Sequence, residues 1–276
     1  MIELPEAKTI ARDLRREIPG KTIAEVGGNF TDHRFTFYGG DPDEYDRLLS
    51  GRMVTDIIDR NVYVEIEVED YALTMRDGAN ISFCGPDSKL PGKSKLLLQF
   101  ADGSFINVTV SMYAFIGVRN RHNPIDNEYY SHDVNGIGAL DEAFSFAYFS
   151  GLINDVTRKL SAKAFLATEQ RFVGIGNGVC QDILFNARIN PRQKMNSLSE
   201  VQIEGLYNSV RSTLTAMVEQ GGRDTEKNIY GVPGGYRTIM SSKTYRTGCP
   251  VCKSEIVKEQ YLGGSVYYCP HCQPRP

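Results

Sequence analysis

Four of the six cysteines stand in two pairs near the end of the 276-residue chain, and their spacing is the strongest chemical signal in the sequence. Two residues separate the members of each pair, and 16 residues separate the pairs. The four are Cys249, Cys252, Cys269 and Cys272. Two intervening residues let both thiolates of a pair reach one ion, and four thiolates close a tetrahedral shell with no open position. We therefore predict a structural zinc site, with a tight hairpin at Gly263-Gly264.

A second candidate site is the segment Gly174-Ile-Gly176-Asn177, which precedes a helical pattern over residues 177–187. Two glycines let the backbone approach a phosphate closely. Asn177 is expected at the N-cap, where the first N–H groups of a helix and its dipole favour an anion. The same residues also fit a plain corner between two helices, so by themselves they leave phosphate binding open.

The amino terminus reads, by itself, as the start of a helix over residues 5–18. Pro5 suits the first helical position, Glu6 complements the helix dipole, and apolar residues recur at helical spacing up to Pro19-Gly20. From residue 21 to 118 the pattern is that of strands. Residues 62–68 alternate as in a half-buried strand, and Asp102-Gly103 predicts a hairpin between the runs 96–100 and 105–110.

The rest of the chain predicts loops at 36–46 and 85–94, a polar connection at 119–141 and then a helical half. Helices are expected at 141–151, 153–168, 177–187 and 198–219. The last one begins with a capping-box pattern, Ser197 to Glu200, and stops at Gly221-Gly222. Residues 223–247 read as a loop. One helix followed by many strands indicates a sandwich or a barrel in the N-terminal half, and with the helices that follow it an α+β fold.

Composition limits the classes of protein that fit. The chain is 41% hydrophobic and 24% charged, which excludes a disordered or collagen-like protein. No apolar run reaches the roughly 18 residues of a spanning helix and no secretory signal is visible, so we expect a cytoplasmic location with reduced thiols. Residues 1–140 hold 15 Lys and Arg against 22 Asp and Glu, whereas residues 141–276 hold 16 against 12. The second half is thus the better candidate for facing a polyanion.

The three pieces together, in this order, resemble the formamidopyrimidine-DNA glycosylase/endonuclease VIII family of base-excision repair enzymes. That family begins Pro-Glu-Leu-Pro-Glu after its initiator methionine, and Glu3 to Glu6 match while Ile2 replaces the first proline. Its helix–two-turn–helix contains Gly-Ile-Gly-Asn before a helix, as at 174–177, and its finger ends in Cys-Pro-x-Cys-Gln, as at 269–273. The resemblance covers nearly the whole chain and is most specific from 141 to 273.

The resemblance implies an N-terminal helix with a β-sandwich at 1–128, a helical helix–two-turn–helix domain at 141–240 and a zinc finger at 241–276. It implies a DNA glycosylase and abasic-site lyase that removes an oxidised base from double-stranded DNA, as a monomer associated with the nucleoid and with structural Zn²⁺. The nucleophile would be the N-terminal amine, since an α-amine with its ordinary pKa of about 7.7–8.0 is partly neutral at physiological pH.

The resemblance also implies roles for individual residues. The catalytic set is Met1, Ile2, Glu3 and Glu6, with Glu3 as general acid and base. The DNA-binding set is Lys163, Gly174, Gly176, Asn177 and Arg246, with Asn177 on a phosphate that flanks a flipped nucleotide.

Several positions depart from the family's pattern. Methionine removal generally needs a small second residue, so Met1 is expected to stay before Ile2, and either its amine acts from one residue further out or no amine acts. Arg60 to Tyr63 offer no lysine where the family contacts DNA. Four further positions differ: Gly78 for a strand-plugging methionine, Ser111 to Gly117 for a stack-filling loop, Gly264 for the finger's arginine and Asp182 for a glutamate.

These departures leave three hypotheses. The first is a repair glycosylase and abasic-site lyase with altered or reduced activity. The second is a catalytically degenerate relative that binds damaged DNA. The third is a zinc-ribbon protein that binds a protein or RNA partner.

Overall fold

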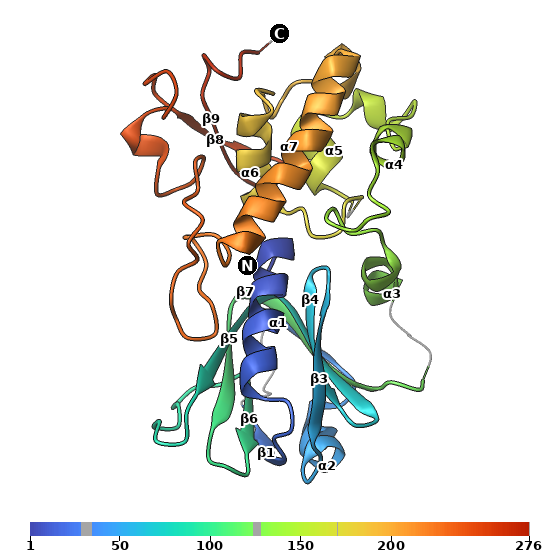
Figure 1. Ribbon diagram of the computed structural model, residues 1–276, viewed down its shortest axis with the longest axis vertical. Helices are drawn as coiled ribbons and strands as arrows, with labels where there is room; N and C mark the ends of the chain where they lie inside the picture. Colours follow the sequence, from blue (N-terminus) through green and yellow to red (C-terminus); the bar gives the residue numbers. More distant parts are fainter. Residues whose placement is uncertain (29–34, 124–127, 170, 276) are drawn as a thin grey trace. The chain divides into compact units, whose positions relative to one another are not determined.

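The computed structural model describes residues 1–28, 35–123, 128–169 and 171–275. The described chain divides into two compact units (Figure 1): the first comprises Met1–Asn135 with Glu226–Gly234, and the second comprises Gly136–Thr225 with Gly235–Pro276. The four-cysteine segment therefore belongs to the helical unit, and a short later segment belongs to the strand-rich one. The expected three-domain division at 1–128, 141–240 and 241–276 stays a prediction.

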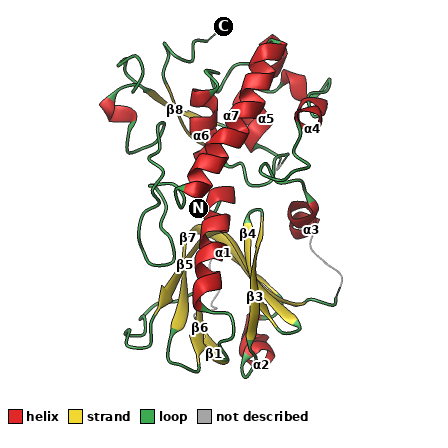
Figure 2. Ribbon diagram, in the orientation of Figure 1, coloured by secondary structure: helices red, strands yellow, loops and turns green. Residues whose placement is uncertain are grey.

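The first unit is a helix packed on a sheet (Figure 2). Within the described residues its strands form one hydrogen-bonded sheet in the order β1-β6-β7-β5-β4-β3, with β2 parallel to β7. The elements are α1 (Leu4–Glu17), β1 (Ile23–Gly27), β2 (Thr36–Gly39), η1 (Pro42–Glu44), α2 (Tyr45–Leu49), β3 (Val54–Arg60), β4 (Tyr63–Val68), β5 (Tyr71–Cys84), β6 (Leu96–Phe100), β7 (Phe105–Asn120) and α3 (Glu128–Asn135). The apolar stripe of α1 joins the strands in one buried core.

Most local predictions for this unit are confirmed. The helix expected at 5–18 is α1, and β6 and β7 form the hairpin at Asp102-Gly103, where Gly103 has φ +85°. The loop expected at 36–46 is wrong, because it contains β2, η1 and α2. Tyr45 explains these short elements, since its buried ring donates a hydrogen bond from Oη to Gly39 O at 2.7 Å.

A bulge bends the two longest strands of the sheet. The register of β5 against β7 shifts between Asp77 and Ala79, and Asp77 has φ +59°. A Cβ on the intervening Gly78 would lie 2.7 Å from the carbonyl oxygen of Tyr113, so glycine is required for this close approach. The bulge matters for the site because Asp77 also pairs with residue 2 of the chain.

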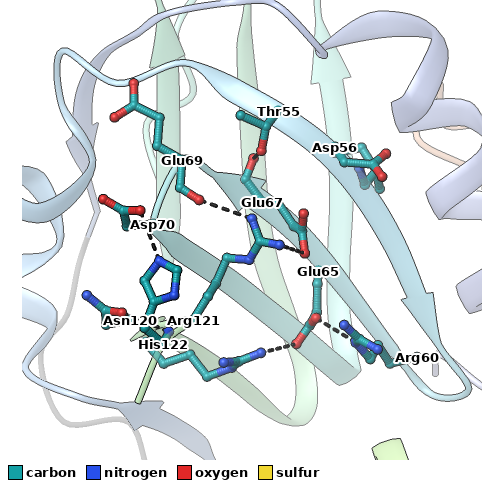
Figure 3. A network of polar contacts seen from close by, with 12 residues as sticks. Thr55, Asp56, Arg60, Glu65, Glu67, Glu69, Asp70, Asn120, Arg121 and His122 are labelled. Carbon is teal, nitrogen blue, oxygen red and sulfur yellow. Dashed lines mark hydrogen bonds and ion pairs between the residues drawn. The ribbon is translucent and has the colours of Figure 1, made fainter.

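Strand β4 departs from the half-buried pattern that its alternation predicted, since every residue from Tyr63 to Val68 is buried. Glu65 accepts a hydrogen bond from Arg60 Nε at 2.9 Å, and Glu67 pairs with Arg121 at 2.9 Å (Figure 3). Glu65 also accepts a hydrogen bond from the Tyr130 hydroxyl. The polar face is therefore covered by side chains of the protein, from Arg60 on the neighbouring strand and from Arg121 and Tyr130 later in the chain. Buried carboxylates of this kind persist because each is paired.

The second unit combines helices with a two-stranded ribbon. Its elements are α4 (Phe146–Gly151), η2 (Thr157–Lys159), α5 (Ala162–Ala167), α6 (Asn177–Asn186), η3 (Met195–Ser197), α7 (Glu200–Glu219), η4 (Tyr245–Thr247), β8 (Val257–Tyr261) and β9 (Gly264–Tyr268). The helices expected at 177–187 and 198–219 and the hairpin at Gly263-Gly264 are confirmed. Among the described residues, no helix combines the length and the apolarity needed to cross a membrane.

Three expectations for this unit are corrected. Residues 141–145 precede α4 in turns, and the helix expected at 153–168 is split into η2 and α5, because Ser161 caps α5 by accepting a hydrogen bond from Ala164 N–H. The capping box of α7 uses Ser199 and Gln202 rather than Ser197 and Glu200. Residues 195–197 instead form the 3-10 turn η3 before the helix.

Candidate functional site

The first residues of the chain lead into α1 through backbone contacts. The Ile2 N–H donates to Asp77 O at 2.6 Å, and the Ile2 side chain is buried in the core. Glu3 is the N-cap of α1 and Glu6 is its third residue; the Glu6 carboxylate accepts a hydrogen bond from Glu3 N–H at 3.3 Å, and the Glu3 side chain accepts one from Glu6 N–H. The nitrogen at position 2 is therefore an amide in a strand-like bridge.

The α-amine of Met1 lies at a cavity of about 270 Å³ within the first unit. Its nitrogen is 2.5 Å from Oε2 of Glu226, and the two side chains are 34% and 28% exposed. Glu6, Asn80 and Ser82 also line this cavity. The cavity therefore holds an amine with a carboxylate against it and further polar side chains in its wall, which is what an amine nucleophile with a proton acceptor requires.

The segment that carries Glu226 is anchored at several points. The side chain of Ile229 is fully buried in the core of the first unit, and its carbonyl accepts a hydrogen bond from Phe83 N–H at 2.9 Å. Tyr230 donates from Oη to Glu17 Oε1 on α1 at 2.6 Å. The Gly234 N–H donates to Glu226 O at 3.1 Å and closes the segment. These contacts hold Glu226 at a defined place beside the N-terminus.

A buried charged cluster includes Asp77, the first residue of the bulge. Arg76 forms ion pairs with Asp77 at 2.8 Å and with Asp133 at 2.6 Å, and its guanidinium lies 4.8 Å from the centre of the Tyr63 ring. Burial raises the pKa of the Asp77 carboxyl, and the positive charge of Arg76 opposes this shift. The cluster fixes the strand position whose carbonyl receives the Ile2 N–H.

In the second unit, the predicted phosphate-binding corner contacts the ribbon. Gly176 is the N-cap of α6 and Asn177 is its first residue, which corrects the expected N-cap position. Asn177 is exposed, and its Nδ2 donates to Ser265 O at 3.2 Å; Gln181 donates to the same carbonyl at 2.8 Å. A Cβ on Gly264 would lie 3.3 Å from the Asn177 amide group, so Gly264, where the resemblance leads one to expect an arginine, directly adjoins Asn177.

The other predicted DNA-binding residues lie in different settings. Lys163 is 3% exposed, its Nζ donates to Tyr261 O at 2.5 Å, and burial lowers the pKa of its ammonium. Arg246 is exposed on η4, with Nε donating to the Tyr245 hydroxyl at 2.8 Å. Gly174 is buried with φ +90° in the turn before α6. Lys163 and Asn177 thus both bind the backbone of the β8–β9 hairpin, whereas Arg246 presents its guanidinium at the surface of this unit.

The four predicted metal ligands converge. The sulfurs of Cys249, Cys252, Cys269 and Cys272 all lie within 4.8 Å of one another. Two of the separations are 3.8 Å, between Cys249 and Cys272, and 3.4 Å, between Cys252 and Cys269. Sulfurs placed about 2.3 Å from a tetrahedral ion would be about 3.8 Å apart, so this cluster fits one metal ion. The Cys272 N–H lies 3.3 Å from the Cys269 sulfur and suits a thiolate.

Gln273 joins this cluster to the helical part of the same unit. Its side chain is fully buried, its Oε1 accepts from Cys269 N–H at 3.0 Å, and its Nε2 donates to Ile189 O at 2.8 Å. Asn190 donates from Nδ2 to Gln273 O at 2.9 Å. The glutamine that closes the finger motif is therefore a positioning residue for the ligand loop.

Sequence reasoning missed Gln181 and Glu226. Gln181 follows Asn177 by one helical turn, so the helical period could have placed both on one face. Glu226 had no local signal, because it stands in a segment that reads as a loop and meets the amine across 225 positions of sequence.

These features define a class: an α+β protein with an N-terminal amine at a cavity of its strand-rich unit, a helix–two-turn–helix corner and a four-cysteine ribbon. Residues 136–228 match the family model described as the formamidopyrimidine-DNA glycosylase H2TH domain. The chain is 26% identical to the formamidopyrimidine-DNA glycosylase of Shouchella clausii, over 100% of both chains, and 27% identical to that of Lactobacillus delbrueckii subsp. bulgaricus, over 100% of both.

Solved structures share the whole fold. The MutM (Fpg) protein of Thermus thermophilus is similar with a TM-score of 0.81 and 24% identity over 99% of each chain. The Lactococcus lactis Fpg in a complex with abasic-site DNA is similar with a TM-score of 0.80 and 23% identity, over 99% of this chain and 100% of that one. Residues 136–228 thus carry the helix–two-turn–helix domain of formamidopyrimidine-DNA glycosylases, and the whole chain is similar to proteins of that name, as its sequence motifs predicted.

Proposed function

We propose that this protein is a base-excision repair glycosylase and abasic-site lyase that acts on oxidised bases in double-stranded DNA. The observation that carries the proposal is the position of the Met1 α-amine at the 270 Å³ cavity, with a carboxylate 2.5 Å away. The relatives named above are called formamidopyrimidine-DNA glycosylases, and this chain matches them over their full length. The Lactococcus lactis Fpg, which has the same fold, binds DNA that contains an abasic site, and this supports the same class of substrate here.

In this proposal, the amine of Met1 replaces the family's proline nitrogen, since the nitrogen of Ile2 is an amide that donates to Asp77 O. The neutral amine forms a bond to C1′ of the damaged nucleotide while the bond from C1′ to the base breaks, and the leaving base takes up a proton. Opening of the sugar then gives a Schiff base, from which loss of a C2′ proton expels the 3′ phosphate.

The acidic residues at the start of α1 would serve this reaction through proton transfer and charge. Glu3 is 5% exposed and Glu6 is 4% exposed, and both are oriented by the capping box. A general acid held in one orientation near C1′ can protonate the ring oxygen or the leaving base. Glu3 is the proposed acid and base because it follows the amine most closely in the chain.

The second unit would hold the DNA backbone. Asn177 is exposed at the N-terminus of α6, where N–H groups favour a phosphate, and Arg246 is an exposed cation of the same unit. The four cysteines would hold Zn²⁺, whose closed shell of thiolates would supply a cross-link for the ribbon. Lys163 would act by holding the hairpin, because its ammonium already donates to Tyr261 O.

Borohydride trapping tests the proposal. Protein mixed with a duplex that contains an abasic site should form a covalent adduct on reduction, and the modified peptide should be the one that begins at Met1. Complete absence of an adduct, with DNA binding retained, would refute the lyase function.

One observation favours a second candidate, a relative that binds damaged DNA without cleaving it. Gly264 leaves no cation beside Asn177 at the position of the family's arginine. Under this candidate, binding to abasic-site duplex is salt-dependent and specific, but trapping yields nothing at any pH.

A further inference from the structure

The N-terminus of this chain has a neighbour that its sequence motifs do not predict. Glu226 comes from the segment 226–234, lies far from Met1 in sequence and meets the α-amine at 2.5 Å. The match to the family model ends at residue 228, so it covers only the beginning of this segment. Both partners lie in the first unit, and they line the same cavity as Asn80 and Ser82.

We propose that Glu226 is the proton-accepting partner of the Met1 α-amine in Schiff-base formation. This inference rests on the proposed function and deepens it. It assigns the residue that makes a primary amine at position 1 usable where the family employs a proline at the next position. Glu3 and Glu6 are less suited to this task, because their carboxylates accept backbone hydrogen bonds of the capping box at α1.

The proposed reaction is the condensation of the Met1 amine with an abasic site in its aldehyde form. The ammonium of Met1 gives one proton to the Glu226 carboxylate. The neutral amine adds to C1′, the carbon–oxygen double bond becomes a hydroxyl after a proton shift from nitrogen to oxygen, and a carbinolamine results. Glu226 then returns its proton to that hydroxyl, which leaves as water, and the product is a protonated imine beside a carboxylate.

The anchoring of the segment explains why Glu226 can do this. Ile229 is fully buried, Phe83 donates to its carbonyl at 2.9 Å, and Tyr230 binds Glu17 at 2.6 Å. A carboxylate on a fixed backbone is already placed for proton transfer before DNA arrives. Both partners remain about one-third exposed, so the amine is also accessible from the cavity.

The test compares six full-length proteins in single-turnover trapping with cyanoborohydride and an abasic-site duplex: wild type, Glu226→Gln, Glu226→Asp, Glu226→Ala, Tyr230→Phe and Glu204→Gln. General-base catalysis is typically worth about 10²–10⁴-fold, so Glu226→Gln should slow adduct formation about 100-fold. Its dissociation constant for the duplex should stay within about twofold of wild type. Glu226→Asp keeps the carboxylate and should recover about tenfold of the loss.

Two measurements separate proton transfer from a merely structural role. Added formate should accelerate Glu226→Ala in proportion to its concentration, because it supplies the missing carboxylate. Tyr230→Phe removes one anchor of the same segment but keeps the Glu226 carboxylate, so added formate should not accelerate it. The matched control Glu204→Gln, an exposed residue of α7, should trap like wild type.

The outcomes distinguish this inference from the proposed function. Trapping by wild type with an unchanged rate in Glu226→Gln overturns the role of Glu226 and leaves the lyase intact. No acceleration of Glu226→Ala by formate, or an equal acceleration of Tyr230→Phe, also overturns it. An adduct on a lysine instead of the Met1 peptide overturns it as well. No adduct in wild type overturns both the inference and the proposed function.

Discussion

Replacement of Gln273 by alanine should destabilise the four-cysteine ribbon more than replacement of an exposed residue in the same ribbon. The glutamine side chain is fully buried and satisfies two backbone groups, Cys269 N–H at 3.0 Å and Ile189 C=O at 2.8 Å. A buried polar group left without a partner costs about 1–3 kcal/mol, so the loss of both partners should destabilise the ribbon by roughly 2–6 kcal/mol. A value of about 4 kcal/mol corresponds to about a thousandfold in the opening equilibrium.

The assay is release of zinc from the loaded protein to a chromogenic chelator, combined with urea unfolding of the same samples. If the ribbon must open before metal leaves, Gln273→Ala should release zinc about 10³-fold faster than wild type. Gln260→Ala is the matched control. Gln260 is exposed on β8, and its side-chain amide donates a hydrogen bond to the hydroxyl of Ser265 on β9. A release rate for Gln273→Ala within threefold of this control would refute the reasoning.

Three further predictions concern other positions. Gly78→Ala should cost about 1–3 kcal/mol in urea unfolding, because the new methyl would meet Tyr113 O at 2.7 Å; an unchanged midpoint would contradict the bulge geometry. Burial raises the pKa of the Asp182 carboxyl, so the native state keeps its proton to higher pH than the unfolded chain does. The stabilisation by Asp182 is therefore complete below about pH 3.9 and is lost as pH rises through the native pKa. The stability difference between wild type and Asp182→Asn should shrink over that range, and a difference that grows would sink the argument. Gly264→Arg should place a cation beside Asn177 and increase the salt dependence of DNA binding by about one unit of the log–log slope, which filter binding at several salt concentrations would reveal or exclude.

The elements that the sequence predicts correctly are those whose signals are local. The cysteine pairs carry their own spacing, and α1 is bounded by Pro5 at its start and Pro19-Gly20 just after it. The cap of α7 is ambiguous in the sequence, because Ser197 and Ser199 offer the same hydroxyl. The 3-10 turn η3, which contains Ser197, leaves Ser199 as the N-cap.

The features that the sequence does not reveal depend on partners far away in the chain. Alternation along β4 suggests that Glu65 faces water, yet Tyr130 and Arg119 cover it from positions more than 50 residues later. Glu226 meets Met1 for the same kind of reason, since tertiary contacts such as the packing of Ile229 bring that segment to the N-terminus. Such contacts follow from tertiary structure and leave no periodicity to detect.

The assignment of residues 226–234 to the strand-rich unit has a consequence for dissection of the molecule. The polypeptide passes between the two units three times, so neither unit is a continuous stretch of chain. A fragment that stops at Asn135 would lack Ile229, and an emptied site of that size in an apolar interior costs about 2–5 kcal/mol. A chimera that exchanges one unit between relatives would therefore fold only if residues 226–234 come from the same protein as residues 1–135.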